Sequence, residues 1–261
     1  MSFPIFRFGG PTVAFRLGGR TFMTDPTFDA PGDYPIGARV LTKTGAPTGT
    51  PADAGPVDVV LLSHDQHPDN FDNAGREFAA TVPLVLCTPV TAQRLGPPAH
   101  ALRTWTSIDL PQRDGTSGVR VTAVPAQHGP DGTEHLTGPV AGFVLSGDGL
   151  PTVYVSGDNA SLPVVEQIAD RFPAVDVAVL FGGAARTPLL GDANLTLDAA
   201  GMVEATRILG ARTVVPVHVD GWAHFTEGVA EVAAAFNAAG IADVLRVPPP
   251  GDSILDAAPR R

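Results

Sequence analysis

Short apolar runs that end in polar side chains dominate the first half of the chain. Residues 57–62 are apolar at every position except Asp58, which is typical of a strand covered on both faces. Residues 12–17 and 20–24 alternate polar and apolar positions across Gly18-Gly19, which predicts a β-hairpin whose glycines adopt positive φ. The pattern also predicts two short helices and five further strands. The helices span 73–80 and 89–95, and the strands lie near 84–87, 101–105, 119–124, 140–146 and 152–156.

The second half alternates between helical and strand periodicity. It predicts helices at 163–171, 197–209 and 227–239 and strands at 175–181, 213–217 and 244–247. Gly210 and Gly240 are placed to end the last two helices, and Thr226 to begin the final one. Hairpins followed by strand–helix pairs fit two packed sheets with helices outside, within a single domain spanning 1–261.

Residues 26–56 break this regularity. They are rich in Pro, Gly, Thr and Asp and show little periodicity. A structureless segment of this length inside a compact domain is usually a functional lid or a disordered loop, and both interpretations stay open.

The polar residues that follow the predicted strands are mostly His and Asp. The strand at 57–62 leads into His64, His67, Asp69, Asn70 and Asp72, and three later strands lead into His128, Asp158 and His218 in that order. One such residue at a strand end is usually a cap. Four strand ends that offer imidazoles and carboxylates predict a metal site held on a rigid base.

This order resembles the metallo-β-lactamase fold of metallohydrolases, and within it the branch of L-ascorbate-6-phosphate lactonase. That family carries His-x-His-x-Asp-His after a buried strand, then a single His, a bridging Asp and a final His on later strands. Thr24-Asp25-Pro26 and Pro216-Val-His218 also look like this branch. The resemblance implies an α/β fold, a four-layer αββα sandwich of two mixed sheets with outer helices, whose active site lies along one edge of the sheets.

The first motif departs from the family pattern. From His64 it runs His-Asp-Gln-His-Pro-Asp-Asn, so Gln66 stands at the second His and Asn70 at the last. In one interpretation a residue is inserted and His67 supplies the missing imidazole. In the other, a two-metal site is partly lost, because amides bind zinc less well than imidazoles. The sequence therefore predicts one or two divalent metal ions.

The candidate ligands contain no thiolate, which suits zinc and also manganese or iron. The predicted metal ligands are His64, His67, Asp69, His128, Asp158 and His218. By resemblance, Asp158 would bridge two metals, and Asp69 would hold the second metal or orient the hydroxide; both are the predicted catalytic residues. Trp222 and His224 follow closely after a presumed ligand and are candidates for substrate binding, although both could instead pack the loop.

This chemistry predicts a metal-dependent hydrolase that attacks a small acyl, lactone or phosphoester substrate through a metal-bound hydroxide. The alternative is a degenerate member of the fold that binds a ligand or a structural metal without turnover. The net charge of −10 and the single lysine, Lys43, argue against nucleic acid as a partner. No stretch approaches a membrane span, and the first residues lack a signal-peptide core, so we expect a cytoplasmic protein with a small-molecule substrate. Homo-oligomer formation stays open.

Overall fold

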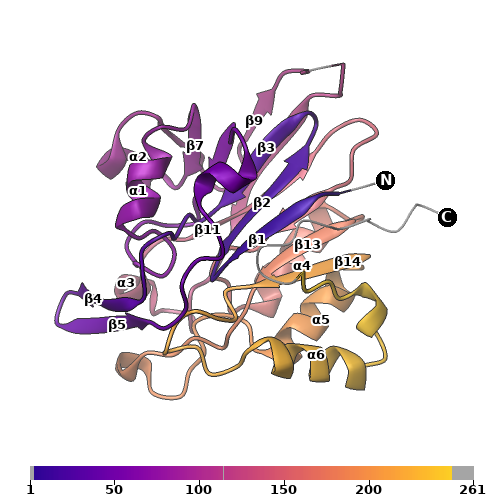
Figure 1. The fold of residues 1–261 in the computed structure, drawn as a ribbon. Helices are drawn as coiled ribbons and strands as arrows, with labels where there is room; N and C mark the ends of the chain where they lie inside the picture. The colour runs from indigo at the N-terminus through magenta and orange to yellow at the C-terminus, as the bar shows by residue number, and fades with distance from the viewer. Residues whose placement is uncertain (1–2, 114, 249–261) are drawn as a thin grey trace.

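The computed structural model describes residues 3–113 and 115–248, in which two six-stranded sheets pack face to face with helices outside them (Figure 1). The first sheet has the order β1-β2-β3-β6-β7-β8, with β1–β3 antiparallel and β3, β6, β7 and β8 parallel. Its strands are β1 (Ile5–Gly9), β2 (Thr12–Leu17), β3 (Arg20–Thr24), β6 (Val59–Leu61), β7 (Leu84–Cys87) and β8 (Ala99–Ala101).

The second sheet has the order β14-β13-β12-β11-β10-β9. Strands β12, β13 and β14 are parallel, and β11, β10 and β9 are antiparallel to their neighbours. Its strands are β9 (Ser107–Leu110), β10 (Val119–Pro125), β11 (Ala141–Ser146), β12 (Val153–Val155), β13 (Val177–Phe181) and β14 (Thr213–Val217). Both sheets are mixed, as predicted, and the polar residues of interest follow the parallel strands β6, β12 and β14 and the antiparallel strand β10.

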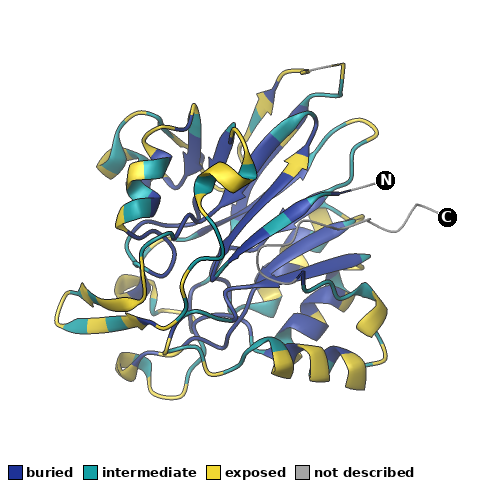
Figure 2. Ribbon diagram, viewed as in Figure 1, coloured by how far each residue is buried: buried dark blue, intermediate teal, exposed yellow. Residues whose placement is uncertain are grey.

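Alternation along β6 explains its nearly continuous apolar sequence. Val59 and Leu61 face the core between the two sheets, whereas Val60 faces the opposite side. There Val60 packs in a cluster with side chains of α1 (Asn73–Ala79) and α2 (Pro89–Leu95). Because water reaches neither face, both sets of positions must be apolar. Figure 2 shows the strands as the buried centre and the outer surfaces of the helices as exposed.

The outer face of the second sheet is covered by α4 (Leu162–Arg171), α5 (Ala199–Leu209) and α6 (Val229–Ala238). Gly210 ends α5 in the left-handed conformation, with φ of 59°, as the sequence predicted. The helix α6 is capped by Gly228, which corrects the prediction of Thr226. The Thr226 hydroxyl donates instead to the carbonyl of Ala184, so it is not free to cap the helix. A short α3 (Glu134–Thr137) lies between β10 and β11.

Three other predicted segments differ in the structure. Residues 26–56 are not structureless: they contain the hairpin of β4 (Gly32–Ile36) and β5 (Arg39–Lys43) and a 3-10 turn at Pro51–Ala54. Most hairpin positions are exposed or half-exposed, so no apolar alternation revealed it. The strand expected at 101–105 is wrong, because β8 ends at Ala101 and β9 begins at Ser107. The closing strand expected at 244–247 is a 3-10 turn, Ala242–Val244, followed by one isolated bridge to β14.

Among the helices in the described ranges, none is both long enough and apolar enough to span a bilayer.

Candidate metal centre

Four strand ends bring the predicted residues together around Asp158, which is completely buried. His64 follows β6, and its Nε2 lies 3.9 Å from Asp158 Oδ2. His128, which follows β10, places Nε2 at 3.6 Å from the same oxygen. His218, directly after β14, places Nε2 at 3.7 Å from the other carboxylate oxygen. Asp158 therefore has imidazoles on both sides, from both sheets.

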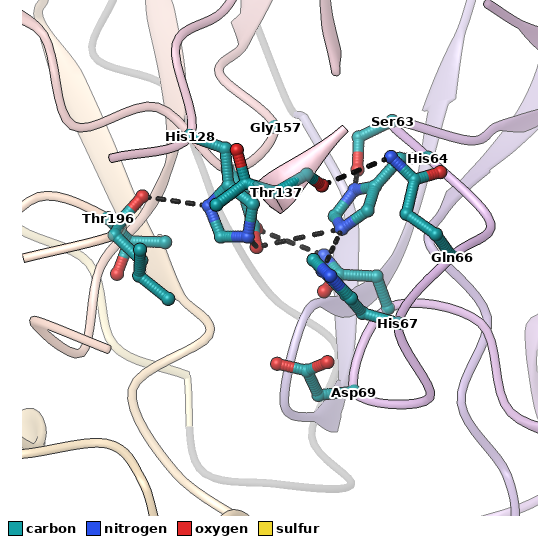
Figure 3. A network of polar contacts seen from close by, with 12 residues as sticks. Ser63, His64, Gln66, His67, Asp69, His128, Thr137, Gly157 and Thr196 are labelled. Carbon is teal, nitrogen blue, oxygen red and sulfur yellow. Dashed lines mark hydrogen bonds and ion pairs between the residues drawn. The ribbon is translucent and has the colours of Figure 1, made fainter. Parts of the chain in front are cut away.

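Three of these imidazoles form a compact group, hereafter the three-imidazole cluster: His64, His67 and His128. One ring nitrogen from each lies within 4.8 Å of the other two. His64 Nε2 and His67 Nδ1 are 3.0 Å apart, and Figure 3 shows the three rings turned toward one another. Tetrahedral zinc ligands at 2.0–2.1 Å from the metal would be about 3.3 Å from one another. The His64–His67 pair therefore has about the spacing of two ligands on one metal ion, and the third imidazole lies within 4.8 Å of both.

Backbone carbonyls fix the tautomers of two of the imidazoles. His128 Nδ1 lies 2.9 Å from the carbonyl oxygen of Leu195, and His218 Nδ1 lies 3.1 Å from that of Gly182. Because a carbonyl only accepts, each Nδ1 carries a proton, so Nε2 is the ring nitrogen that faces Asp158 and would bind a metal. His218 also holds a positive φ of 59°, a strained conformation for a residue with a Cβ.

A chain of hydrogen bonds from Asp25 through Ser63 fixes the tautomer of His64 in the same way. Ser63 Oγ lies 2.8 Å from His64 Nδ1 and hydrogen bonds to Asp25, which also accepts from the Ser63 amide. A hydroxyl that donates to Asp25 accepts from His64 Nδ1–H, which leaves His64 Nε2 free to bind a metal. Complete burial raises the pKa of Asp25 to about 7, although hydrogen bonds from Ser63 and Asn70 oppose this rise.

The electrostatics of the centre favour a bound cation. Burial would raise the pKa of Asp69, but the imidazoles of His218 and His224 hold it well below its usual range. The pKa of Asp158 is also lowered: burial is outweighed by His218 and neighbouring imidazoles. Conversely, burial would lower the pKa of His218, but the two carboxylates raise it to about 9. Two ionised carboxylates, Asp69 and Asp158, thus lie beside the same buried imidazoles.

Several buried atoms at the centre have no hydrogen-bond partner. They include Asp69 Oδ1, Asn70 Oδ1, Asp158 Oδ2, His218 Nε2 and His224 Nδ1. Unpartnered buried polar atoms are costly, and they are found where an ion or ligand completes the site. Burial also lowers the pKa of His64 to about 3 and that of His67 to about 4, so both are neutral and able to bind a metal. The residues present therefore fit a divalent metal ion.

The structure separates His67 from Gln66. His67 belongs to the three-imidazole cluster, whereas the Gln66 amide nitrogen donates to the carbonyls of Thr137 and Pro139, at 3.3 and 3.0 Å. The two successive side chains therefore have different surroundings, at a bend of the chain that includes Gln66. The geometry favours the interpretation in which an inserted residue brings His67 to the metal position.

Other polar residues of the first motif support the fold. Asp72 caps α1 and forms a buried ion pair with Lys43 at 3.0 Å. Asp65 receives the guanidinium of Arg94 and the hydroxyl of Thr91, both from α2. These contacts fasten the loop that carries His64 and His67 to its neighbouring helices. Asp25, Ser63 and Asp65 were not among the predicted site residues, since the contacts Asp25–Ser63 and Asp65–Arg94 join positions that are distant in sequence.

A cavity of about 30 Å³ opens beside the cluster. His67, Asp69 and His128 line its floor, and the β4–β5 hairpin contributes Ile36, Arg39 and Leu41. The remaining lining residues include Ala185, Arg186, Thr187, Leu195 and His224. The hairpin, which belongs to the segment 26–56 that could be a lid, therefore lines this cavity. Its mobility stays a prediction.

The two candidate substrate-binding residues lie in different surroundings. His224 lines this cavity, and its Nε2 is 2.9 Å from Asp69 Oδ2. Trp222 lines a separate cavity of about 150 Å³ together with Gly10 and Lys43. Its backbone bridges to Lys43, which fixes the loop against β5. The structure thus brings His224, but not Trp222, into the cavity beside the cluster.

Sequence comparison identifies relatives over most of the chain. A family model described as a β-lactamase superfamily domain matches residues 20–219, which include every predicted metal ligand. A UPF0173 metal-dependent hydrolase from Pelotomaculum thermopropionicum is 31% identical over 206 residues, covering 76% of this chain and 82% of that protein. Another, from Pyrococcus abyssi, is 26% identical over 216 residues, covering 83% and 84%.

Solved structures share the fold at low sequence identity. An isothiocyanate hydrolase from Delia radicum gut bacteria superposes with a TM-score of 0.81 at 20% identity, covering 98% of this chain and 100% of that one. A possible metal-dependent hydrolase from Veillonella parvula gives a TM-score of 0.79 at 18% identity, covering 97% and 98%.

Proposed function

Because this chain belongs to the metallo-β-lactamase superfamily and, within it, to the UPF0173 metal-dependent hydrolases, we propose that it hydrolyses a small anionic ester, lactone or phosphoester. The observation that carries the proposal is the set of unpartnered carboxylate and imidazole atoms around Asp158. Zinc is the proposed metal, since the cluster offers three imidazoles and no thiolate.

A divalent metal held by the three-imidazole cluster and Asp158 would lower the pKa of water from about 15.7 to roughly 7 and polarise the bond under attack. The residues of this chain provide the rest. Asp25 and Ser63 hold the proton on His64 Nδ1, which keeps Nε2 available. His224 Nε2 contacts Asp69, so Nδ1 is the ring atom left to exchange a proton with the substrate.

The cavity lining supports a small substrate with a negative charge. Arg39 and Arg186 are its two arginines, and Ile36 and Leu41 provide an apolar wall. Arg39 donates one N–H to Thr187 Oγ1, at 2.6 Å. Its other guanidinium N–H groups remain available to a carboxylate or phosphate of the substrate. With the hairpin in this position only about 30 Å³ is open, so entry of a larger substrate requires the hairpin to move.

We expect Arg39→Met to raise KM for an anionic ester about 10-fold and to leave KM for its uncharged analogue nearly unchanged. The reason is that a hydrogen bond to a charged group contributes about 1.5–3 kcal/mol, and exposure of the arginine brings the effect toward the lower value. Steady-state kinetics on the matched pair of esters measures this difference. Equal changes for both esters would contradict a charge-recognition role.

Arg120→Met is the matched control. Arg120 lies at the start of β10, whereas the cavity lies beyond the end of that strand, and its ion pair with Asp109 is exposed. Loss of an exposed pair costs little stability. KM for either ester is expected to be unchanged in this variant.

The proposal as a whole is tested by turnover of a substrate panel before and after removal of metal. The panel contains esters, lactones and phosphoesters, each in charged and uncharged form, together with an isothiocyanate. We expect hydrolysis of at least one anionic member, its loss on chelation and its return with Zn²⁺. A fully metal-loaded protein that hydrolyses none of the panel would instead support the alternative, a protein that binds its metal without turnover.

A further inference from the structure

We infer that the centre holds one cation, in the three-imidazole cluster, and that Asn70 and His224 close the position where a second cation would bind. That second position is the side of Asp158 that faces Asp69 and His218. The inference rests on the proposed function, because it concerns the same centre. It follows from how the side chains at the second position use their polar atoms.

The Asn70 amide blocks one oxygen that a second cation would need. Its Nδ2 donates to Asp158 Oδ1 at 3.0 Å and to Asp25 Oδ2 at 2.9 Å, so both amide hydrogens are used. Two carboxylate acceptors fix the amide orientation, because the opposite orientation would place oxygen against oxygen. The positive end of the amide dipole therefore points at the Asp158 oxygen on the side of His218.

His224 occupies the second carboxylate. Its Nε2 lies 2.9 Å from Asp69 Oδ2, and His218 Nε2 approaches the same oxygen at 3.4 Å. His224 comes from the loop after β14 and lies 155 positions beyond Asp69 in sequence. A cation at Asp69 Oδ2 would have to displace this imidazole. At the second position, one oxygen of each carboxylate is thus already occupied by a group of the chain itself.

In the three-imidazole cluster, His64 Nε2 and His67 Nδ1 hydrogen bond only to each other among the described residues, and the carboxylate oxygen that faces the cluster is free. The ring nitrogens of the cluster lie within 4.8 Å of one another, and in the described parts of the chain no other set of three His, Cys, Asp or Glu side chains is grouped in this way. Asp158 Oδ2, the oxygen that faces this cluster, has no hydrogen-bond partner. Asp158 therefore presents its free Oδ2 to the cluster, whereas its Oδ1, on the side of the second position, accepts a hydrogen bond from Asn70.

The strongest evidence for a second cation is that three buried atoms on this side have no hydrogen-bond partner: Asp69 Oδ1, Asn70 Oδ1 and His218 Nε2. A neutral amide oxygen is a poor zinc ligand but an acceptable one for harder ions such as Mn²⁺. The test therefore needs both ions.

The first experiment measures metal stoichiometry. Protein stripped with a chelator is equilibrated separately with excess Zn²⁺ and Mn²⁺, freed of unbound ion, and analysed for metal per chain. We expect one equivalent of Zn²⁺ and no more than one of Mn²⁺. Two equivalents of either ion would overturn the inference and leave the proposed function standing. No bound metal at all would overturn both.

The second experiment tests the two residues. The double variant Asn70→His, His224→Ala supplies an imidazole at position 70 and frees Asp69, so it is expected to bind a second equivalent of Zn²⁺. His224→Ala alone is expected to keep one equivalent. Asn237→His adds an imidazole on the exposed surface of α6 and is also expected to keep one. A folded double variant, judged by circular dichroism, that binds fewer than two equivalents would overturn the role assigned to Asn70 and His224.

Discussion

His67→Ala is expected to lose its metal, whereas Gln66→Ala is expected to keep it. His67 Nδ1 lies 3.0 Å from His64 Nε2, inside the three-imidazole cluster, so its removal opens a coordination position. The Gln66 amide instead donates to the carbonyls of Thr137 and Pro139, so it supports the loop that carries His67 without binding the metal. Loss of such support costs about 10- to 100-fold in metal affinity, and loss of a direct ligand should exceed that range.

Competition for Zn²⁺ against a chromophoric chelator, at several chelator concentrations, measures both affinities on one scale. Circular dichroism of the metal-free variants checks that each is folded. If Gln66→Ala were the variant that lost its metal while His67→Ala retained it, the inserted-residue interpretation of the motif would be wrong.

Asp72→Ala is expected to lower the free energy of unfolding by about 3–5 kcal/mol. Its carboxylate accepts from the backbone amides of Phe28, Asp29 and Gly75 and pairs with Lys43, and the side chains of both charged partners are almost completely buried. The substitution leaves a buried ammonium without a partner and three amides without an acceptor. It should therefore detach the hairpin segment from α1.

Urea unfolding of the metal-free proteins measures this loss, and two variants control it. Asp29→Ala removes a more exposed acceptor at the same helix terminus, so we expect about 1 kcal/mol. The double variant Asp72→Ala, Lys43→Met also removes the buried ammonium that Asp72→Ala leaves without a partner, so it should recover part of the lost stability. A loss for Asp72→Ala no larger than that for Asp29→Ala would show that the buried pair contributes little.

The strand ends of the centre were predictable because each combines two local signals. An apolar run marks a covered strand, and a His or Asp directly after it marks a functional end. His64, Asp158 and His218 follow their strands within three residues, and the parallel pairing of β12 and β14 with β13 brings two of these ends to one edge. The fold class followed from the same periodicity, together with the family resemblance.

The contacts that tune the centre could not be predicted in this way. Asp25 hydrogen bonds to Ser63 across 38 positions and to Asn70 across 45, and these links exist only once β3 and β6 are paired. Asp72 looked like a further candidate of the metal cluster because composition does not distinguish a ligand from a helix cap. The hairpin of β4 and β5 was missed because its exposed side chains carry no apolar period.

The most direct test of a metal centre in the three-imidazole cluster is anomalous diffraction from crystals of the zinc-loaded protein, measured on both sides of the zinc absorption edge. The account predicts one strong peak per chain, about 2.0–2.1 Å from His64 Nε2, His67 Nδ1 and His128 Nε2 and next to Asp158 Oδ2. A principal peak elsewhere, or a fully zinc-loaded crystal without density among these three imidazoles, would contradict it.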